Sequence, residues 1–457
     1  MNAPRRSPGS RKQRPNPSGK ILIVGLGKTG LSCARYLSAR GLEVAVTDSR
    51  DQPPGLERLR EELPDVALFL GGFDASAFAS AEQLVVSPGV SLRTPVIAEA
   101  LRRGVPVLGD VELFARAARA PVVAVTGSNG KSTVTTLAGE MARRAGREVR
   151  VGGNLGTPAL ELLGATEPDL YVLELSSFQL ETTQTLNAKS AAVLNVSPDH
   201  MDRYRDVQEY AAAKARVYRG DGCRVVNADD PRVLAMVVPG RRVLRFTLEA
   251  PRADDFGLLA RGGEAWLAHG GEAWLAEREL RVSGRHNTAN ALAALALGHS
   301  VGLEREPMLQ TLREFQGLPH RTQWVAERDG VRWYNDSKGT NVGATLAALQ
   351  GMPGKLVLIA GGDGKGADFT PLRAACAAKA RAVVLIGRDA PLIEAALAGV
   401  VPVMRAAGMD QAVAEARRLA QPGDAVLLSP ACASFDMFSG YEERGRVFTD
   451  AVGRLLG

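Results

Sequence analysis

The sequence predicts an α/β protein of three domains. Short apolar runs typical of strands alternate with alanine- and leucine-rich stretches typical of helices, a pattern that favours parallel sheets. Two of these runs end in glycine-rich loops that open a helix. The chain has 457 residues, which corresponds to about three ordinary domains.

The composition is that of a globular protein with a packed core. Apolar residues make up 45% and charged residues 23% of the chain. No apolar run approaches the ~18–20 residues that cross a bilayer, which excludes an integral membrane protein. The four cysteines stand far apart without a C-x-x-C pair, so we expect neither a disulfide scaffold nor a zinc site, and a cytoplasmic location.

The net charge of +6 has a local origin. The first twenty residues contain six basic residues and no acid, and the rest of the chain has 50 basic and 50 acidic residues. Residues 1–19 are rich in Pro, Ser, Gly and Asn and lack an apolar core, which predicts a disordered basic tail and no secretory signal. We expect a solvated extension and neither a nucleic-acid partner nor a membrane partner.

The first strand–loop–helix unit begins at residue 21. The run ILIV is followed by Gly25, Gly27 and Gly30 in G-x-G-x-x-G spacing, and the next strand, EVAVTD, ends at Asp48. Such glycines let the backbone approach a pyrophosphate, and the acid suits a ribose hydroxyl. This pattern fits the nicotinamide dinucleotide of an oxidoreductase, but it fits the pyrophosphate of a UDP-sugar equally well.

A second unit starts at residue 121, where PVVAVTG is followed by SNGKST and a helix to about residue 145. Loop amides and the lysine of such a P-loop bind triphosphate oxygens, and the hydroxyl after the lysine binds Mg²⁺. Residue 125 is Val where the strict motif has its first glycine, which indicates a shorter variant of the loop. A triphosphate loop has little use in an oxidoreductase and counts against that hypothesis.

Further polar residues follow predicted strands. Glu174 ends a strand over 170–175 and is placed to hold Mg²⁺, while His200 follows the run AAVLNV at 191–196. Lys214 lies in a helical run, and the repeat GGEAWLA at 262–268 and 270–276 predicts a surface hairpin. A third α/β region carries strands over 355–362, 382–387 and 425–430.

Ten motifs in order resemble those of the Mur ligases, the ATP-dependent amide ligases of peptidoglycan precursor synthesis. The resemblance runs from about residue 20 to the end. The motifs are TGSNGKST (126–133), GGNLGTP (152–158), LELSSFQLE (173–181), NVSPDHMDRY (195–204), YAAAK (210–214), GRHNTANALAA (284–294), LPHRTQ (318–323), NDSKGTN (335–341), GGDGKGADF (361–369) and SPACASFDMF (429–438). The C-terminal motifs are most similar to those of the member that adds D-glutamate.

The resemblance implies a Rossmann-like N-terminal domain over 20–109 that binds a UDP substrate. It implies a P-loop ATPase-like central domain over 110–317 and a Rossmann-like C-terminal domain over 318–457 that binds the amino acid. The implied UDP-substrate residues are Lys28, Thr29, Asp48, Ser49, Arg50, Ser87, Gly89 and Asn154. The implied ATP residues are Gly127, Ser128, Asn129, Gly130, Lys131, Ser132, Thr133, Asn287, Asn290, Arg321 and Asp336.

The resemblance also implies two Mg²⁺ ions, held by Ser132, Thr133, Glu174, His200 and Lys214, with Lys214 carbamylated. A carbamate supplies the hard anionic oxygen that a lysine cation cannot. The implied catalytic residues are Lys131, His200, Lys214 and Lys338, and the implied D-glutamate residues are Thr340, Lys365, Ser434, Phe435 and Tyr441.

The expected reaction joins D-glutamate to UDP-N-acetylmuramoyl-L-alanine through an acyl phosphate, in a monomeric enzyme. Two alternatives stay open on the sequence. One is a sister ligase that uses another amino acid, such as L-glutamate, and the other is an NAD-dependent oxidoreductase.

Overall fold

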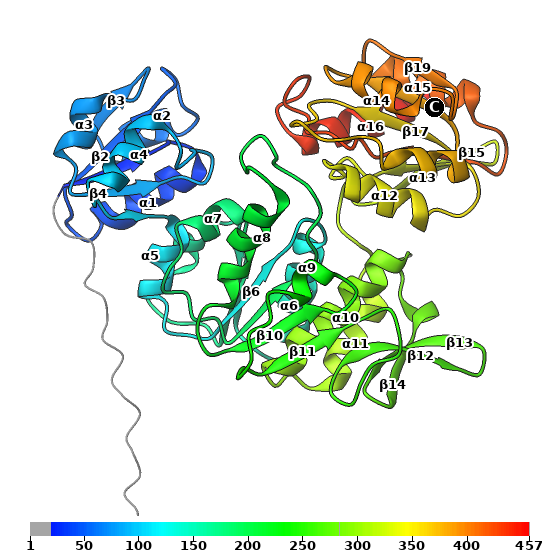
Figure 1. Ribbon diagram of the computed structural model, residues 1–457, viewed down its shortest axis with the longest axis horizontal. Helices are drawn as coiled ribbons and strands as arrows, with labels where there is room; N and C mark the ends of the chain where they lie inside the picture. Colours follow the sequence, from blue (N-terminus) through cyan, green and yellow to red (C-terminus); the bar gives the residue numbers. More distant parts are fainter. Residues whose placement is uncertain (1–19, 283, 457) are drawn as a thin grey trace, which may run out of the picture.

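The computed structural model describes residues 20–282 and 284–456, which form three lobes, each built on its own sheet (Figure 1). The predicted basic tail, residues 1–19, lies outside the described residues. The predicted strands all form, and so does the predicted hairpin. The four cysteines are free and buried, and no helix in the described part of the chain is long and apolar enough to cross a membrane.

The first lobe has a five-stranded, fully parallel sheet in the order β3-β2-β1-β4-β5. Its strands are β1 (Ile21–Val24), β2 (Val44–Asp48), β3 (Ala67–Leu70), β4 (Gln83–Val86) and β5 (Val107–Leu108). Its helices are α1 (Lys28–Ser38), α2 (Leu56–Glu62), α3 (Ala75–Ser80) and α4 (Pro95–Arg102). The strand order reverses between β1 and β4, and in such sheets ligands bind at the carboxyl ends of the strands that flank this point.

The central lobe has a nine-stranded sheet in the order β14-β13-β12-β11-β10-β9-β6-β8-β7. Its strands are β6 (Val122–Thr126), β7 (Val149–Gly153), β8 (Leu170–Glu174), β9 (Ser190–Val193), β10 (Cys223–Asn227), β11 (Val243–Phe246), β12 (Phe256–Arg261), β13 (Glu264–His269) and β14 (Glu272–Ala276). Its helices are α5 (Asp110–Ala117), α6 (Lys131–Arg144), α7 (Ser177–Glu181), α8 (Val207–Ala215), α9 (Pro231–Leu234), α10 (Arg285–Ser300) and α11 (Arg305–Glu314). The strands from β7 to β12 pair in parallel, and β13 and β14 extend the sheet as an antiparallel edge.

The third lobe has a six-stranded sheet in the order β15-β16-β20-β17-β18-β19, antiparallel only between β15 and β16. Its strands are β15 (Gln323–Arg328), β16 (Val331–Asn335), β17 (Leu356–Gly361), β18 (Ala380–Ile386), β19 (Val403–Arg405) and β20 (Ala425–Leu428). Its helices are α12 (Val342–Gly351), α13 (Leu372–Lys379), α14 (Ala390–Leu397), α15 (Met409–Leu419) and α16 (Tyr441–Leu456). Separate apolar clusters cover the two faces of this sheet, as a layered α/β core requires.

The lobes are joined in two different ways. A single apolar cluster runs from the first sheet through α5 into the central lobe. The third lobe instead meets the central loops through polar contacts, from Arg321 to Ser132 at 3.0 Å, Asn341 to Asn129 at 3.2 Å and Lys365 to Asp199 at 2.5 Å. Segments predicted to bind different ligands therefore come together at the centre.

Candidate active site

The loop between β6 and α6 is shaped for an anion. Gly130 has a left-handed φ of 83°, and a Cβ there would lie 2.4 Å from Oδ1 of Asn290, so no other residue fits this turn. The Lys131 ammonium donates to the carbonyl oxygens of Gly127 and Ser128 at 2.8 and 2.9 Å. The backbone amides of the first turn of α6 and the Lys131 ammonium lie at the same loop. Together they make it positively charged, as a triphosphate site requires.

Glu174, at the carboxyl end of β8, is placed for a cation. Its side chain is buried, and its Oε1 accepts a hydrogen bond from Asn154 Nδ2 at 2.7 Å. Its Oε2 is buried with no hydrogen-bond partner, which is unfavourable unless a ligand binds that oxygen. Among the residues described, no three His, Cys, Asp or Glu side chains group to hold a metal alone. A cation here would therefore also use the hydroxyls of Ser132 and Thr133 and substrate oxygens, as Mg²⁺ commonly does.

His200 and Lys214 lie beside the same loop. Burial lowers the pKa of His200 to about 4, despite the neighbouring Asp199 carboxylate, so the imidazole is neutral and able to ligate a metal. Lys214 is 1% exposed, and its Nζ donates to the carbonyl oxygen of Gly127 at 2.8 Å. Burial, reinforced by the charge of Lys131, lowers the pKa of Lys214 well below its ordinary value. A buried amine with a depressed pKa is the form that reacts with CO₂.

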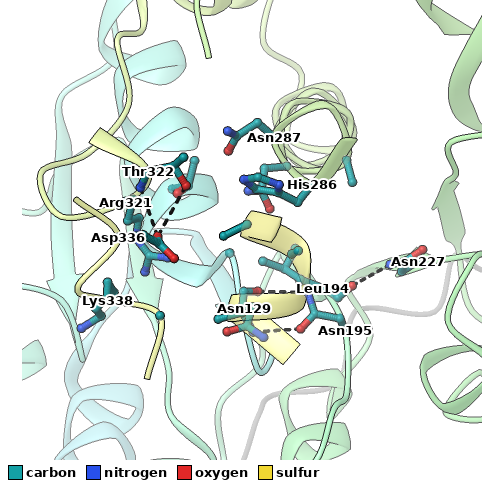
Figure 2. A pocket seen from close by; sticks show the side chains of 18 of the residues that line it. Asn129, Leu194, Asn195, Asn227, His286, Asn287, Arg321, Thr322, Asp336 and Lys338 are labelled. Atoms are coloured by element: carbon teal, nitrogen blue, oxygen red, sulfur yellow. Dashed lines mark hydrogen bonds between the residues drawn. The ribbon is translucent and has the colours of Figure 1, made fainter. Parts of the chain in front are cut away.

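A cavity between the central and third lobes contains most of the predicted ATP residues (Figure 2). Asn129, Gly130, Thr133, Asn287 and Asn290 reach it from the central lobe, and Arg321, Asp336 and Lys338 from the third. Ser132 lines the second cavity. Gly127, Ser128 and Lys131 line neither cavity and are linked to one another by the Lys131 hydrogen bonds given above.

Asp336 is anchored rather than free in this cavity. Its carboxylate accepts a hydrogen bond from the Thr322 amide at 3.1 Å (Figure 2). It accepts another from the Ser429 hydroxyl at 2.7 Å. Burial outweighs these bonds and raises the pKa of Asp336 to about 6.

A second cavity of about 670 Å³ contains all eight predicted UDP-substrate residues. They are Lys28, Thr29, Asp48, Ser49, Arg50, Ser87, Gly89 and Asn154. The cavity starts at the switch point between β1 and β4 and continues to Ser132, Glu174 and Lys338. Because Lys338 lines both cavities, the ends of the two ligands would meet beside it.

The first glycine loop is held by Asp48. A Cβ at Gly30 would lie 1.9 Å from the Gly25 carbonyl oxygen, so α1 packs on β1 only with glycine there. Asp48 accepts hydrogen bonds from the Leu26 amide at 2.7 Å and the Arg50 guanidinium at 2.7 and 2.8 Å. Burial alone would raise the pKa of Asp48, but these bonds outweigh burial and lower it. The Asp48 carboxylate therefore fixes the conformation of the glycine loop. Arg50, which is half exposed, lines the cavity.

The predicted D-glutamate residues are only partly brought to the centre. Lys365 forms an ion pair with Asp199, and the Tyr441 ring lies 3.4 Å beneath the Lys338 ammonium. Thr340, Ser434 and Phe435 line neither cavity, and the Phe435 side chain is 76% exposed.

Several lining residues were not predicted from the sequence. Asn195, Asn227, Phe246, His286 and Thr322 line the first cavity, and Phe73, Gln179 and Glu442 line the second. Gln179, Asn195, His286 and Thr322 stand inside four of the motifs given above, so a sequence signal for them exists. Asn227 and Phe246 end β10 and β11, and only the parallel pairing of these strands places them beside the loop.

Comparison with known proteins decides what kind of protein carries this site. Three family models match consecutive parts of the chain: Mur ligase MurD-like, N-terminal domain (19–109), Mur ligase middle domain (125–298) and Mur ligase, glutamate ligase domain (320–432). The chain is 61% identical over 445 residues to the UDP-N-acetylmuramoylalanine--D-glutamate ligase of Nitrosococcus oceani, covering 97% of this chain and 98% of that one. The chain belongs to the Mur ligase family. The enzyme of the same name from Pseudomonas aeruginosa is 56% identical over 438 residues, covering 95% and 98%.

Solved structures agree on the fold. A pseudomurein peptide ligase type C from Methanothermus fervidus matches with a TM-score of 0.63 at 18% identity, over 95% of this chain and 99% of that one. The UDP-N-acetylmuramate-alanine ligase MurC from Thermotoga maritima matches with a TM-score of 0.60 at 18% identity, over the same shares. As a Mur ligase the chain is an ATP-dependent ligase, which confirms the prediction from the central loop. The alternative of an NAD-dependent oxidoreductase is thereby wrong.

The charge of Lys338 predicts an alkaline limit to activity. Burial, reinforced by Arg321, lowers the pKa of Lys338 to about 8, so its positive charge is present below that pH and lost above it. We expect kcat/KM, which reports the free enzyme, to fall above about pH 8. In kcat the fall is expected at higher pH, because bound phosphates stabilise the ammonium.

The Lys338→Arg variant is the matched control for this pH profile, because guanidinium stays protonated throughout. The variant is expected to have a lower kcat/KM, and its kcat/KM is not expected to fall near pH 8. A fall of kcat/KM at the same pH in both proteins would show that a group other than Lys338 ionises.

Proposed function

We propose that the chain adds D-glutamate to UDP-N-acetylmuramoyl-L-alanine, driven by ATP. The observation that carries the proposal is the junction of the two cavities at Lys338, beside the phosphate loop. The close relatives named above carry this activity in their names. A UDP moiety held at the first glycine loop would extend its acyl end along the second cavity toward Ser132 and Glu174.

The carboxylate of the bound substrate is activated first. A carboxylate is a poor electrophile, and transfer of the γ-phosphoryl group to it makes an acyl phosphate with a good leaving group. Lys131 and Lys338 stabilise the negative charge of the transferring group from opposite lobes. The amine of D-glutamate then attacks the acyl carbon, and phosphate departs from the tetrahedral intermediate.

The donors around the loop fit two Mg²⁺ ions. Glu174, Ser132 and Thr133 would hold one ion, and His200 and a carbamate on Lys214 would hold the other. Bound Mg²⁺ neutralises phosphate charge during transfer. The unpartnered oxygen of Glu174, the neutral imidazole of His200 and the buried amine of Lys214 support this assignment.

D-Glutamate would bind between the central and third lobes. The Lys365 ammonium could bind a carboxylate of D-glutamate there. In this structure it forms an ion pair with Asp199. Of the other residues expected to bind D-glutamate, Tyr441 lines the second cavity, while Thr340, Ser434 and Phe435 lie on the same lobe outside both cavities.

The test is phosphate release from ATP with UDP-N-acetylmuramoyl-L-alanine, comparing D-glutamate, L-glutamate and no amino acid. We expect release with D-glutamate alone. Release with L-glutamate or another amino acid alone would identify a sister ligase and overturn the roles of Thr340, Lys365 and Ser434. No release with any amino acid would contradict the proposal as a whole.

A further inference from the structure

Arg203 connects two parts of the site and has no role in the steps above. Its side chain is 13% exposed and lies between the first and central lobes. Its guanidinium donates to the carbonyl oxygens of Pro88 at 3.0 Å and Val90 at 2.8 Å. These residues belong to the loop after β4, residues 87–90, which lines the UDP-substrate cavity. The loop in turn holds the first glycine loop, because the Ser87 hydroxyl donates to the Gly25 carbonyl oxygen at 2.8 Å.

On its other side Arg203 reaches the surroundings of His200. The guanidinium carbon lies 4.2 Å from the centre of the Phe178 ring, and this ring packs against His200 with centres 4.8 Å apart. The Arg203 amide also donates to the His200 carbonyl oxygen at 2.9 Å. That bond closes a turn in which His200 has a φ of 58°, a conformation that costs free energy and persists only where its surroundings hold it.

An ion pair elsewhere also fastens these two lobes. Arg35 of α1 pairs with Glu161 at 3.2 Å, far along the chain from the 87–90 loop and from His200. The Arg203 guanidinium instead donates hydrogen bonds to the 87–90 loop. Its flat face lies over the Phe178 ring, which packs against His200. Glu181 lies 3.8 Å from the Arg203 guanidinium and balances its charge.

We propose that Arg203 is a positioning residue that couples occupancy of the UDP-substrate cavity to the placement of His200. This inference rests on the proposed function, since it requires a UDP substrate in that cavity. A substrate that orders the 87–90 loop fixes the carbonyl oxygens of Pro88 and Val90, to which Arg203 donates. The guanidinium then fixes the Phe178 ring, which packs against His200. Because coupling between two sites is reciprocal, ligands at the His200 side strengthen substrate binding by the same factor.

The test measures the dissociation constant of UDP-N-acetylmuramoyl-L-alanine by calorimetry, with and without Mn²⁺ and ADP. In the unmodified protein we expect Mn²⁺ and ADP to tighten substrate binding at least about five-fold, the lower end of typical couplings. In Arg203→Gln this factor is expected to fall below about two. Arg203→Lys keeps the charge but cannot span both carbonyl oxygens, and it is expected to lose the coupling too.

Glu161→Gln is the matched control, because it breaks an ion pair between the same lobes away from the site. It is expected to keep the full coupling. Phe178→Leu removes the ring that lies between the Arg203 guanidinium and His200 and leaves the 87–90 loop unchanged. If Arg203→Gln does not fold, Phe178→Leu tests the coupling in its place. Full coupling in Arg203→Gln or, if that variant does not fold, in Phe178→Leu would overturn the inference. Equal loss of coupling in Glu161→Gln would overturn it too.

The same experiment separates this inference from the proposed function. If the unmodified protein binds no UDP substrate, the proposed function fails. If it binds the substrate but Mn²⁺ and ADP change nothing, the coupling alone fails.

Discussion

Replacing Lys131 by alanine is expected to lower kcat about a thousand-fold, equivalent to about 4 kcal/mol of transition-state stabilisation. The ammonium stands at the start of α6 against two loop carbonyl oxygens, where a bound triphosphate would compete for it. In the proposed reaction it stabilises charge that develops during phosphoryl transfer, so its loss is expected to act on kcat. Steady-state phosphate release checks the prediction, and circular dichroism checks that the variant folds.

Lys189→Ala is the matched control, since Lys189 is an exposed lysine of the same lobe that directly precedes β9. Its kcat is expected to be unchanged. A Lys131→Ala enzyme within about three-fold of the unmodified rate would contradict the role given to the loop.

Lys214→Ala is expected to lower kcat at least about a hundred-fold, because in the proposed reaction its carbamate is a ligand of Mg²⁺ and such a ligand is worth several kcal/mol. In the unmodified enzyme, removing CO₂ from the buffer is expected to lower activity, and bicarbonate is expected to restore it. The variant is expected to respond to neither treatment.

The carbamate itself can be observed by ¹³C NMR after incubation with ¹³C-bicarbonate. We expect a carbamate signal in the unmodified protein and none in Lys214→Ala. Full activity without CO₂, together with no signal, would show that Lys214 acts as an unmodified amine.

The elements next to each glycine loop could be predicted because local chemistry determines them. The run before Gly25 and the run before Gly127 are strands, and the helices after them start where the loops end. Where a prediction was less accurate, a non-local contact was responsible. The strand predicted to end at residue 196 ends at Val193, because Asn195 turns to the phosphate loop and binds the Asn129 amide through its side chain at 2.8 Å.

The meeting of the lobes could not be predicted from the residues alone. Lys365 and Asp199 are 166 residues apart, and no spacing rule connects them. Arg203 shows the same limit in a different way. It stands inside the motif NVSPDHMDRY, but its proposed role depends on the two carbonyl oxygens of the first lobe that accept its hydrogen bonds.

The central claim is that the substrate carboxylate is phosphorylated where the two cavities meet. The most direct test uses UDP-N-acetylmuramoyl-L-alanine labelled with ¹⁸O in both carboxylate oxygens, with ATP and D-glutamate. We predict that each released phosphate carries one ¹⁸O atom and that the amide carbonyl of the product keeps the other. Released phosphate without ¹⁸O, alongside formation of the amide, would show that another oxygen attacks ATP and would contradict the account.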